Sequence, residues 1–122
     1  MEITCKRDRW GQLNVSTHVD LGNQQQLRIE TNKAVFSGGL RCAASVVTVY
    51  EGGYQHAFGS RDGTGDWSRT LALKEARGTE KALREFHAET IAKNGGLETI
   101  IGLARAHYAA QAARATIEKA QA

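Results

Sequence analysis

The composition of the chain changes sharply near residue 70. Before this point apolar and polar residues alternate and β-branched residues recur, whereas alanine, glutamate, lysine, arginine and leucine predominate after it. A two-residue alternation is typical of strands with one buried face, and the residues of the second half are strong helix formers. The sequence therefore predicts a sheet within residues 1–73 and helices within residues 74–122.

The length of the chain, 122 residues, suits one domain, residues 1–122, with a single hydrophobic core. We expect an α+β fold in which an antiparallel sheet of about five or six strands is covered on one face by two C-terminal helices. The residues expected to supply much of the core are Leu13, Val15, Leu27, Ile29, Val46, Leu83, Phe86, Ile91, Ile100 and Tyr108.

Five segments of the first half predict strands, at residues 3–7, 13–19, 27–31, 40–50 and 54–58. Over residues 40–50 both alternate sets are apolar, which is typical of a central strand covered on both faces. Residues 66–78 leave two alternatives open. We expect a last strand at Trp67–Leu73, but Asp66 is also a good N-cap for a helix that would begin there.

Two helices are predicted for the rest of the chain. The first begins after Thr79 as N-cap and ends at Asn94-Gly95-Gly96, where glycine can adopt the left-handed conformation. The second runs from about Leu97 towards Lys119. Its alanine-rich end would allow close helix packing, so a homodimer through this helix is one alternative. We expect instead that its first half packs within the chain and its second half faces solvent.

The titratable and nucleophilic residues form no pattern that specifies a reaction. The four histidines are scattered, the two cysteines do not form a C-x-x-C pair, and there is no G-x-S-x-G motif. We therefore expect no catalytic residue, no metal and no cofactor. A hydrolase, the remaining enzymatic alternative, would require at least two of four side chains to converge in a pocket: Cys42, His56, Asp62 and Asp66.

The loop at residues 59–66 is the segment most similar to a ligand-binding motif. It lacks the lysine and the following hydroxyl residue of a phosphate-binding loop. Asp62, Thr64 and Asp66 alternate as in a calcium loop, but Trp67 replaces the glycine of that loop and no acidic residue follows at the required spacing. The sequence therefore predicts a flexible hairpin loop that serves as a contact surface.

The charge balance is mildly basic, because sixteen Lys and Arg against thirteen Asp and Glu give a net charge of +3. This excess permits an acidic partner without requiring one. Basic and aromatic residues recur along the predicted sheet and loop, as in proteins that bind single-stranded nucleic acid. The expected partner-binding residues are Arg7, Arg9, Trp10, Arg41, Tyr54, Arg61, Asp62, Asp66, Trp67 and Arg69.

In its size, its predicted architecture and its lack of a catalytic motif, the chain resembles the small accessory proteins of phages and plasmids, including anti-CRISPR and other anti-defence inhibitors. The resemblance implies a non-catalytic protein that binds stoichiometrically to a nucleic-acid-handling complex, so the partner would be another protein or a nucleoprotein complex. The alternative is direct binding of single-stranded DNA or RNA on the sheet face, by a monomer or a dimer.

The location of the protein is expected to be cytoplasmic. Residues 1–9 carry charges where a signal peptide needs an apolar core, and the longest apolar run, Ala43–Tyr50, is too short to cross a bilayer. Two cysteines do not make a disulfide framework, which agrees with a reducing compartment.

Overall fold

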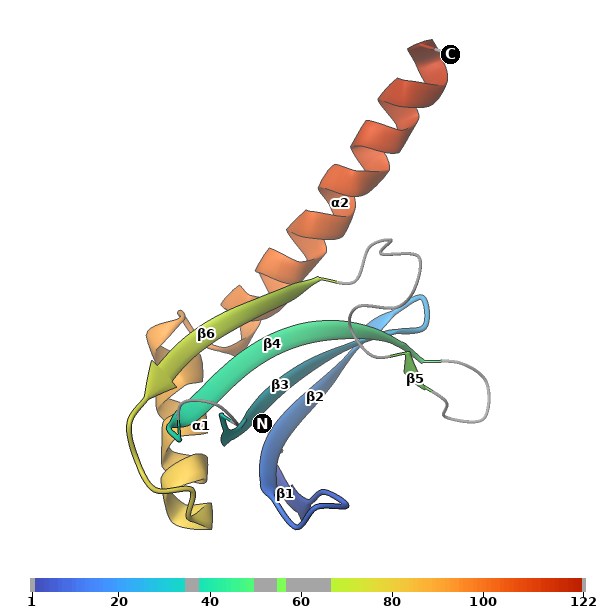
Figure 1. The fold of residues 1–122 in the computed structure, drawn as a ribbon. Helices are drawn as coiled ribbons and strands as arrows, with labels where there is room; N and C mark the ends of the chain where they lie inside the picture. The colour runs from blue at the N-terminus through green and yellow to red at the C-terminus, as the bar shows by residue number, and fades with distance from the viewer. Residues whose placement is uncertain (1, 35–37, 50–54, 57–66, 122) are drawn as a thin grey trace.

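A computed structural model describes residues 2–34, 38–49, 55–56 and 67–121 of the chain. Within these residues six strands form one antiparallel sheet, and two helices follow them (Figure 1). The strands are β1 (Thr4–Arg7), β2 (Leu13–Gly22), β3 (Gln25–Lys33), β4 (Leu40–Val49), β5 (Gln55–His56) and β6 (Ser68–Lys74). The helices are α1 (Glu80–Lys93) and α2 (Leu97–Gln121). The predicted α+β fold is confirmed.

Strand β4 joins the two parts of the sheet. Strands β1 to β4 pair in chain order, and on the other side of β4 both β6 and β5 pair with it. Strand β6 lies along Leu40–Ser45, and β5 lies beside Thr48 and Val49. Of the strand predicted at residues 54–58, only β5 belongs to the described part of the chain.

Residues 68–74 form a strand, which confirms the predicted strand over its helical alternative. The local sequence favours a helix, but pairing with β4 satisfies backbone hydrogen-bonding groups of this segment. The pairing also half-buries Leu71 and Ala72 against the core. Tertiary contacts therefore override local propensity here.

The core lies between the sheet and the helices. Apolar side chains of β2, β3 and β4 meet those of α1 and the beginning of α2. The predicted core residues all belong to this cluster, with Leu13 and Tyr108 half-buried at its border. Burying a side chain such as Leu27 completely stabilises the fold by about 1.5–3 kcal/mol.

The opposite face of the sheet, which we term the open face, is not covered by either helix (Figure 1). The sequence predicts a strand covered on both faces at residues 40–50; the helices cover one face of β4, and on the other face only Val47 is fully buried among the described residues. On the open face Ala43 and Ser45 of β4 are half-buried. The register places the following described residues there: Thr4, Lys6, Asn14, Ser16, His18, Asp20, Gln26, Arg28, Glu30, Asn32, Arg41, Ala43, Ser45, Val47, Ser68, Thr70 and Leu73.

Helix α1 begins and ends as the sequence predicts. The Thr79 hydroxyl accepts a hydrogen bond from the Ala82 backbone N–H at 3.2 Å, which caps the first turn. After the cap residue Asn94, Gly95 and Gly96 have φ values of 90° and 91°. Glycine adopts this conformation without steric cost, so the chain can turn directly into α2.

Helix α2 packs against the rest of the molecule with its first half only. Ile100, Ile101 and Ala104 are buried, whereas every described side chain after Tyr108 is exposed. The second half projects away from the sheet and α1 (Figure 1), as expected from its composition. Within the described part of the chain, no helix combines the length and the apolar character needed to cross a membrane.

Candidate partner-binding surfaces

A row of polar side chains crosses four strands of the open face. Lys6 of β1 pairs with Asn14 of β2, Asn14 with Asn32 of β3, and Asn32 with Arg41 of β4. Residues directly opposite each other in antiparallel strands lie on the same face of a sheet. The four side chains therefore lie next to one another across β1 to β4. On β6 the row continues with the exposed Leu73, which is in register with Arg41.

The neighbouring rows are polar and include small residues. In one of them Ser16, Glu30, Ala43 and Thr70 are in register, from β2 to β6. In the next row the residues in register are His18, Arg28, Ser45 and Ser68. The part of the open face that the structure describes thus contains no Phe, Tyr or Trp side chain.

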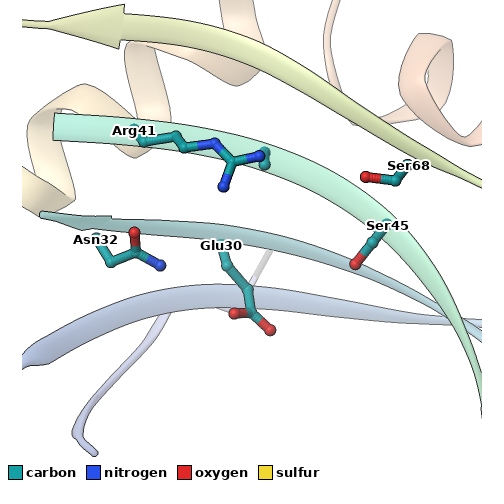
Figure 2. Close-up of a pocket in the computed structure, with 6 residues that line it drawn as sticks. Glu30, Asn32, Arg41, Ser45 and Ser68 are labelled. Atoms are coloured by element: carbon teal, nitrogen blue, oxygen red, sulfur yellow. The ribbon is translucent and has the colours of Figure 1, made fainter. Parts of the chain in front are cut away.

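The centre of the open face is a depression of about 170 Å³. It is lined by Glu30, Asn32, Arg41, Ala43, Ser45 and Ser68 (Figure 2). Figure 2 shows Arg41 extended along β4 and Glu30 directed away from it. The Arg41 guanidinium donates to the Thr70 hydroxyl at 3.1 Å, and Glu30 forms an ion pair with Arg28 at 3.6 Å. The depression therefore offers donors and acceptors to a partner without an internal ion pair between Arg41 and Glu30.

The β1–β2 turn is a second exposed feature. Trp10 is 74% exposed there, and the Arg9 guanidinium carbon lies 4.2 Å from the centre of its ring. This is a cation–π contact. The neighbouring Arg7 guanidinium donates to the Gly11 carbonyl at 2.7 Å. Three of the predicted partner-binding residues, Arg7, Arg9 and Trp10, are thus brought together.

A depression of about 500 Å³ adjoins this turn, between the turn, the end of β3 and the beginning of α1. Its charged lining residues are Arg7, Lys33 and Glu80. The pKa of Glu80 is lowered below its usual range. The main cause is a hydrogen bond from Cys5, and the second is the neighbouring Arg84. Glu80 also forms an ion pair with Arg84 at 3.3 Å, so its charge is partly compensated by its own helix.

The other predicted partner-binding residues lie elsewhere. Arg41 is on the open face, while Arg69 is in register with the buried Ala44 and so lies on the helix side of β6. Trp67 is half-buried against the core, and its backbone N–H donates to the Tyr108 hydroxyl at 3.0 Å. The remaining predicted partner-binding residues lie outside the described part of the chain: Tyr54, Arg61, Asp62 and Asp66.

His87 is the chemically most distinctive residue that the sequence analysis missed. It is fully buried on α1, and burial lowers its pKa to about 4. Its two ring nitrogens each lie 2.8 Å from a buried hydroxyl, those of Thr17 and Thr31. The helical spacing of His87 with Leu83 and Ile91 could have indicated burial. A neutral imidazole with both nitrogens partnered serves to join the helix to the sheet.

Cys42 belongs to the same buried region. Burial raises the pKa of its thiol, while hydrogen bonds with Thr31 and Thr90 act in the opposite direction. Cys42, one of the four residues that a hydrolase would require, is therefore buried between the sheet and the helices. The other three, the His56 side chain, Asp62 and Asp66, lie outside the described part of the chain. Among the side chains that the structure describes, no group of three or more His, Cys, Asp or Glu could hold a metal ion.

Comparison of the chain with protein-family models, with curated proteins and with solved structures gave no match. The fold and its two exposed features, the open face and the β1–β2 turn, are accordingly the basis on which a function can be assigned.

Proposed function

We propose that the protein is a non-catalytic binding protein that holds another protein, free or within a nucleoprotein complex, against the open face of its sheet. The observation that carries this proposal is the open face itself. It is mostly polar, with Leu73 of β6 as its exposed apolar residue; it spans β1 to β4 and β6, and neither helix covers it.

The composition of the open face suits a protein partner better than a nucleic acid. Proteins that bind single strands on a sheet use aromatic side chains as stacking platforms. The described part of this face carries none, and its central row combines Asn14 and Asn32 with Lys6 and Arg41. Such side chains form hydrogen bonds with polar protein surfaces, and arginine is enriched at the residues that dominate binding energy.

The depression at the centre of the open face can accept a side chain of the partner. Ala43, Ser45 and Ser68 are small, so a partner side chain has room beside Arg41. The hydrogen bond from Arg41 to Thr70 restricts the guanidinium before any partner arrives. A side chain that is already ordered loses less conformational entropy on binding. We infer that Arg41 is the central contact of this surface.

The resemblance to small phage and plasmid accessory proteins suggests which partner this would be. Inhibitors of that kind act by occupying a site on a nucleic-acid-handling complex, one copy per site. A partner of this class would be found in the cytoplasm, so we propose that location for the protein. A function that requires binding and no catalysis agrees with a sequence that lacks a catalytic motif.

The proposal is tested by co-purification with the tagged full-length protein from its natural host. Ser45→Arg fills the depression and Arg41→Ala removes its cation; both should weaken capture of the identified partner at least tenfold. Arg105→Ala, on the exposed surface of α2, is the matched control and should capture the partner as the wild type does. Equal capture by all three variants would refute the assignment to the open face.

A further inference from the structure

Trp10 is held in an exposed position by hydrogen bonds of the turn. The Asp8 carboxylate accepts from the backbone N–H groups of Trp10 and Gln12, both at 2.9 Å. The Asp8 N–H donates to the Gln12 carbonyl at 2.8 Å, and the Gly11 N–H donates to the Asp8 carbonyl at 3.0 Å. Gly11 supplies the positive φ, 79°, that closes the turn. The Asp8 side chain and the backbone of the turn therefore fix the position of the Trp10 backbone, although the ring is 74% exposed.

One cation lies against this aromatic ring, and two more line the depression that adjoins the turn. The Arg9 guanidinium lies against the ring, Arg7 is anchored to the carbonyl of Gly11, and Lys33 lines the adjoining depression. The carboxylates of the region have other roles, because Asp8 accepts the hydrogen bonds of the turn and Glu80 pairs with Arg84. Within the described residues, the turn thus combines an exposed ring with an excess of positive charge.

We propose that the β1–β2 turn binds single-stranded nucleic acid. An unpaired base stacks with Trp10, while Arg9, Arg7 and Lys33 contact the phosphates on either side of it. Every base has a face that can stack on an indole ring, and the phosphates supply the negative charge that the three cations attract. A base inside a duplex is not free to stack, so the turn selects unpaired strands.

This inference goes beyond the binding of a protein on the open face and does not depend on it. The turn lies outside the depression of the open face, and it shares no lining residue with that depression. A chain with both surfaces could contact the protein and the nucleic acid of one nucleoprotein complex. One stacked base and a few phosphates make a weak site, suited to act together with a second surface.

The test is a fluorescence titration of the full-length protein with a short oligothymidylate at low salt. The Trp67→Phe background isolates the emission of Trp10, which stacking with a base should quench. Variants at Trp10 have no tryptophan emission in this background, so their affinity is measured by competition with a labelled strand. Trp10→Ala should lower the affinity between about fivefold and a hundredfold relative to wild type, and Trp10→Phe should retain most of it. Arg9→Gln should also weaken binding, whereas the control Arg105→Gln should not.

The same titration is repeated at several salt concentrations and with competitors that lack unpaired bases. Three phosphate contacts predict that log K falls with log salt concentration with a slope of about −2. The inference is overturned if the oligonucleotide leaves the emission unchanged, or if Trp10→Ala binds as tightly as the wild type. Equal binding of a duplex, or of a sulfated polysaccharide without bases, would also overturn it, since charge alone would then explain the affinity. A protein captured through Trp10 in the absence of oligonucleotide binding would assign the turn to a protein partner instead.

The two proposals can fail separately. Loss of the partner in Ser45→Arg with intact oligonucleotide binding supports the open face alone. Quenching that depends on Trp10, in a protein that captures its partner equally well with and without Ser45→Arg, supports the turn and refutes the open face.

Discussion

The Nε2 atom of His87 on α1 lies 2.8 Å from the hydroxyl oxygen of Thr17 on β2. The Nδ1 atom of the same ring lies 2.8 Å from the hydroxyl of Thr31 on β3. All three side chains are buried, so one imidazole joins the helix to two neighbouring strands inside the core. A buried polar network of this kind stabilises the fold only while each member has its partner.

The first prediction concerns pH. Burial holds the pKa of His87 at about 4, whereas an unperturbed histidine has a value of 6.5. Between these values the unfolded chain binds a proton that the folded protein does not bind. The stability that depends on neutral His87 is therefore complete above pH 6.5 and falls as the pH drops towards 4, by about 3 kcal/mol at most.

Urea denaturation at a series of pH values between 7 and 4 measures this loss. His87→Gln removes the titrating ring, so its free energy of unfolding should fall less steeply over the same range. Thr70→Val, an exposed change that removes no titrating group, is the control and should retain the wild-type dependence. Identical slopes in the wild type and His87→Gln would contradict the assignment.

The second prediction removes one partner of the network. Thr31→Val keeps the shape of the side chain but leaves a nitrogen of His87 without its hydroxyl at 2.8 Å. An unsatisfied buried polar group should lower the free energy of unfolding by about 1–3 kcal/mol. The same change at the exposed Thr70 should cost less than about 0.5 kcal/mol. If the two variants were equally stable in urea, His87 would not depend on Thr31.

The third prediction concerns the projecting end of α2. The described side chains of residues 112–121 are exposed, so ending the chain after Gln111 removes no described part of the core. The free energy of unfolding should change by less than about 0.5 kcal/mol. A larger loss would show that this end contacts the body of the protein. Light scattering of the full and shortened chains also tests the alternative of a homodimer, which the shortened chain could not form through the removed residues.

The fourth prediction compares two glycines. A Cβ at Gly39 would lie 2.7 Å from the Lys74 carbonyl oxygen, whereas a Cβ at Gly102 would meet nothing within 4 Å. Gly39→Ala must therefore move β4 against the end of β6, at a cost of about 1–3 kcal/mol. Gly102→Ala should stabilise α2 by about 0.5–1 kcal/mol, because alanine is the better helix former. Thermal unfolding of both variants checks the opposite signs.

Local patterns in the sequence were sufficient to predict most of the fold. The alternation of Leu13, Val15 and Thr17 gave the buried face of β2, and Thr79 and the pair Gly95-Gly96 gave the ends of α1. Each of these signals depends on a few neighbouring residues. A single sequence carries them without knowledge of the tertiary contacts.

The open face could not be predicted in the same way. That Lys6 and Arg41 lie in one row across the sheet depends on the order and register of four strands. Those features follow from long-range pairing, which no local pattern specifies. The sequence predicts Arg9 and Trp10 as partner-binding residues, which stays a prediction. The hydrogen bonds of Asp8 that fix the turn depend on the folded backbone, so the sequence alone does not show them.

Within the described residues, the apolar face of the sheet is covered mainly by side chains from the last third of the chain, from Leu83 to Tyr108. A ribosome releases β2, β3 and β4 well before it has made these residues, because synthesis proceeds from the N-terminus. Until α1 has left the exit tunnel, the nascent sheet therefore either exposes its apolar face to solvent or remains unformed. We expect chaperones that recognise exposed aliphatic strands to bind this chain during its synthesis.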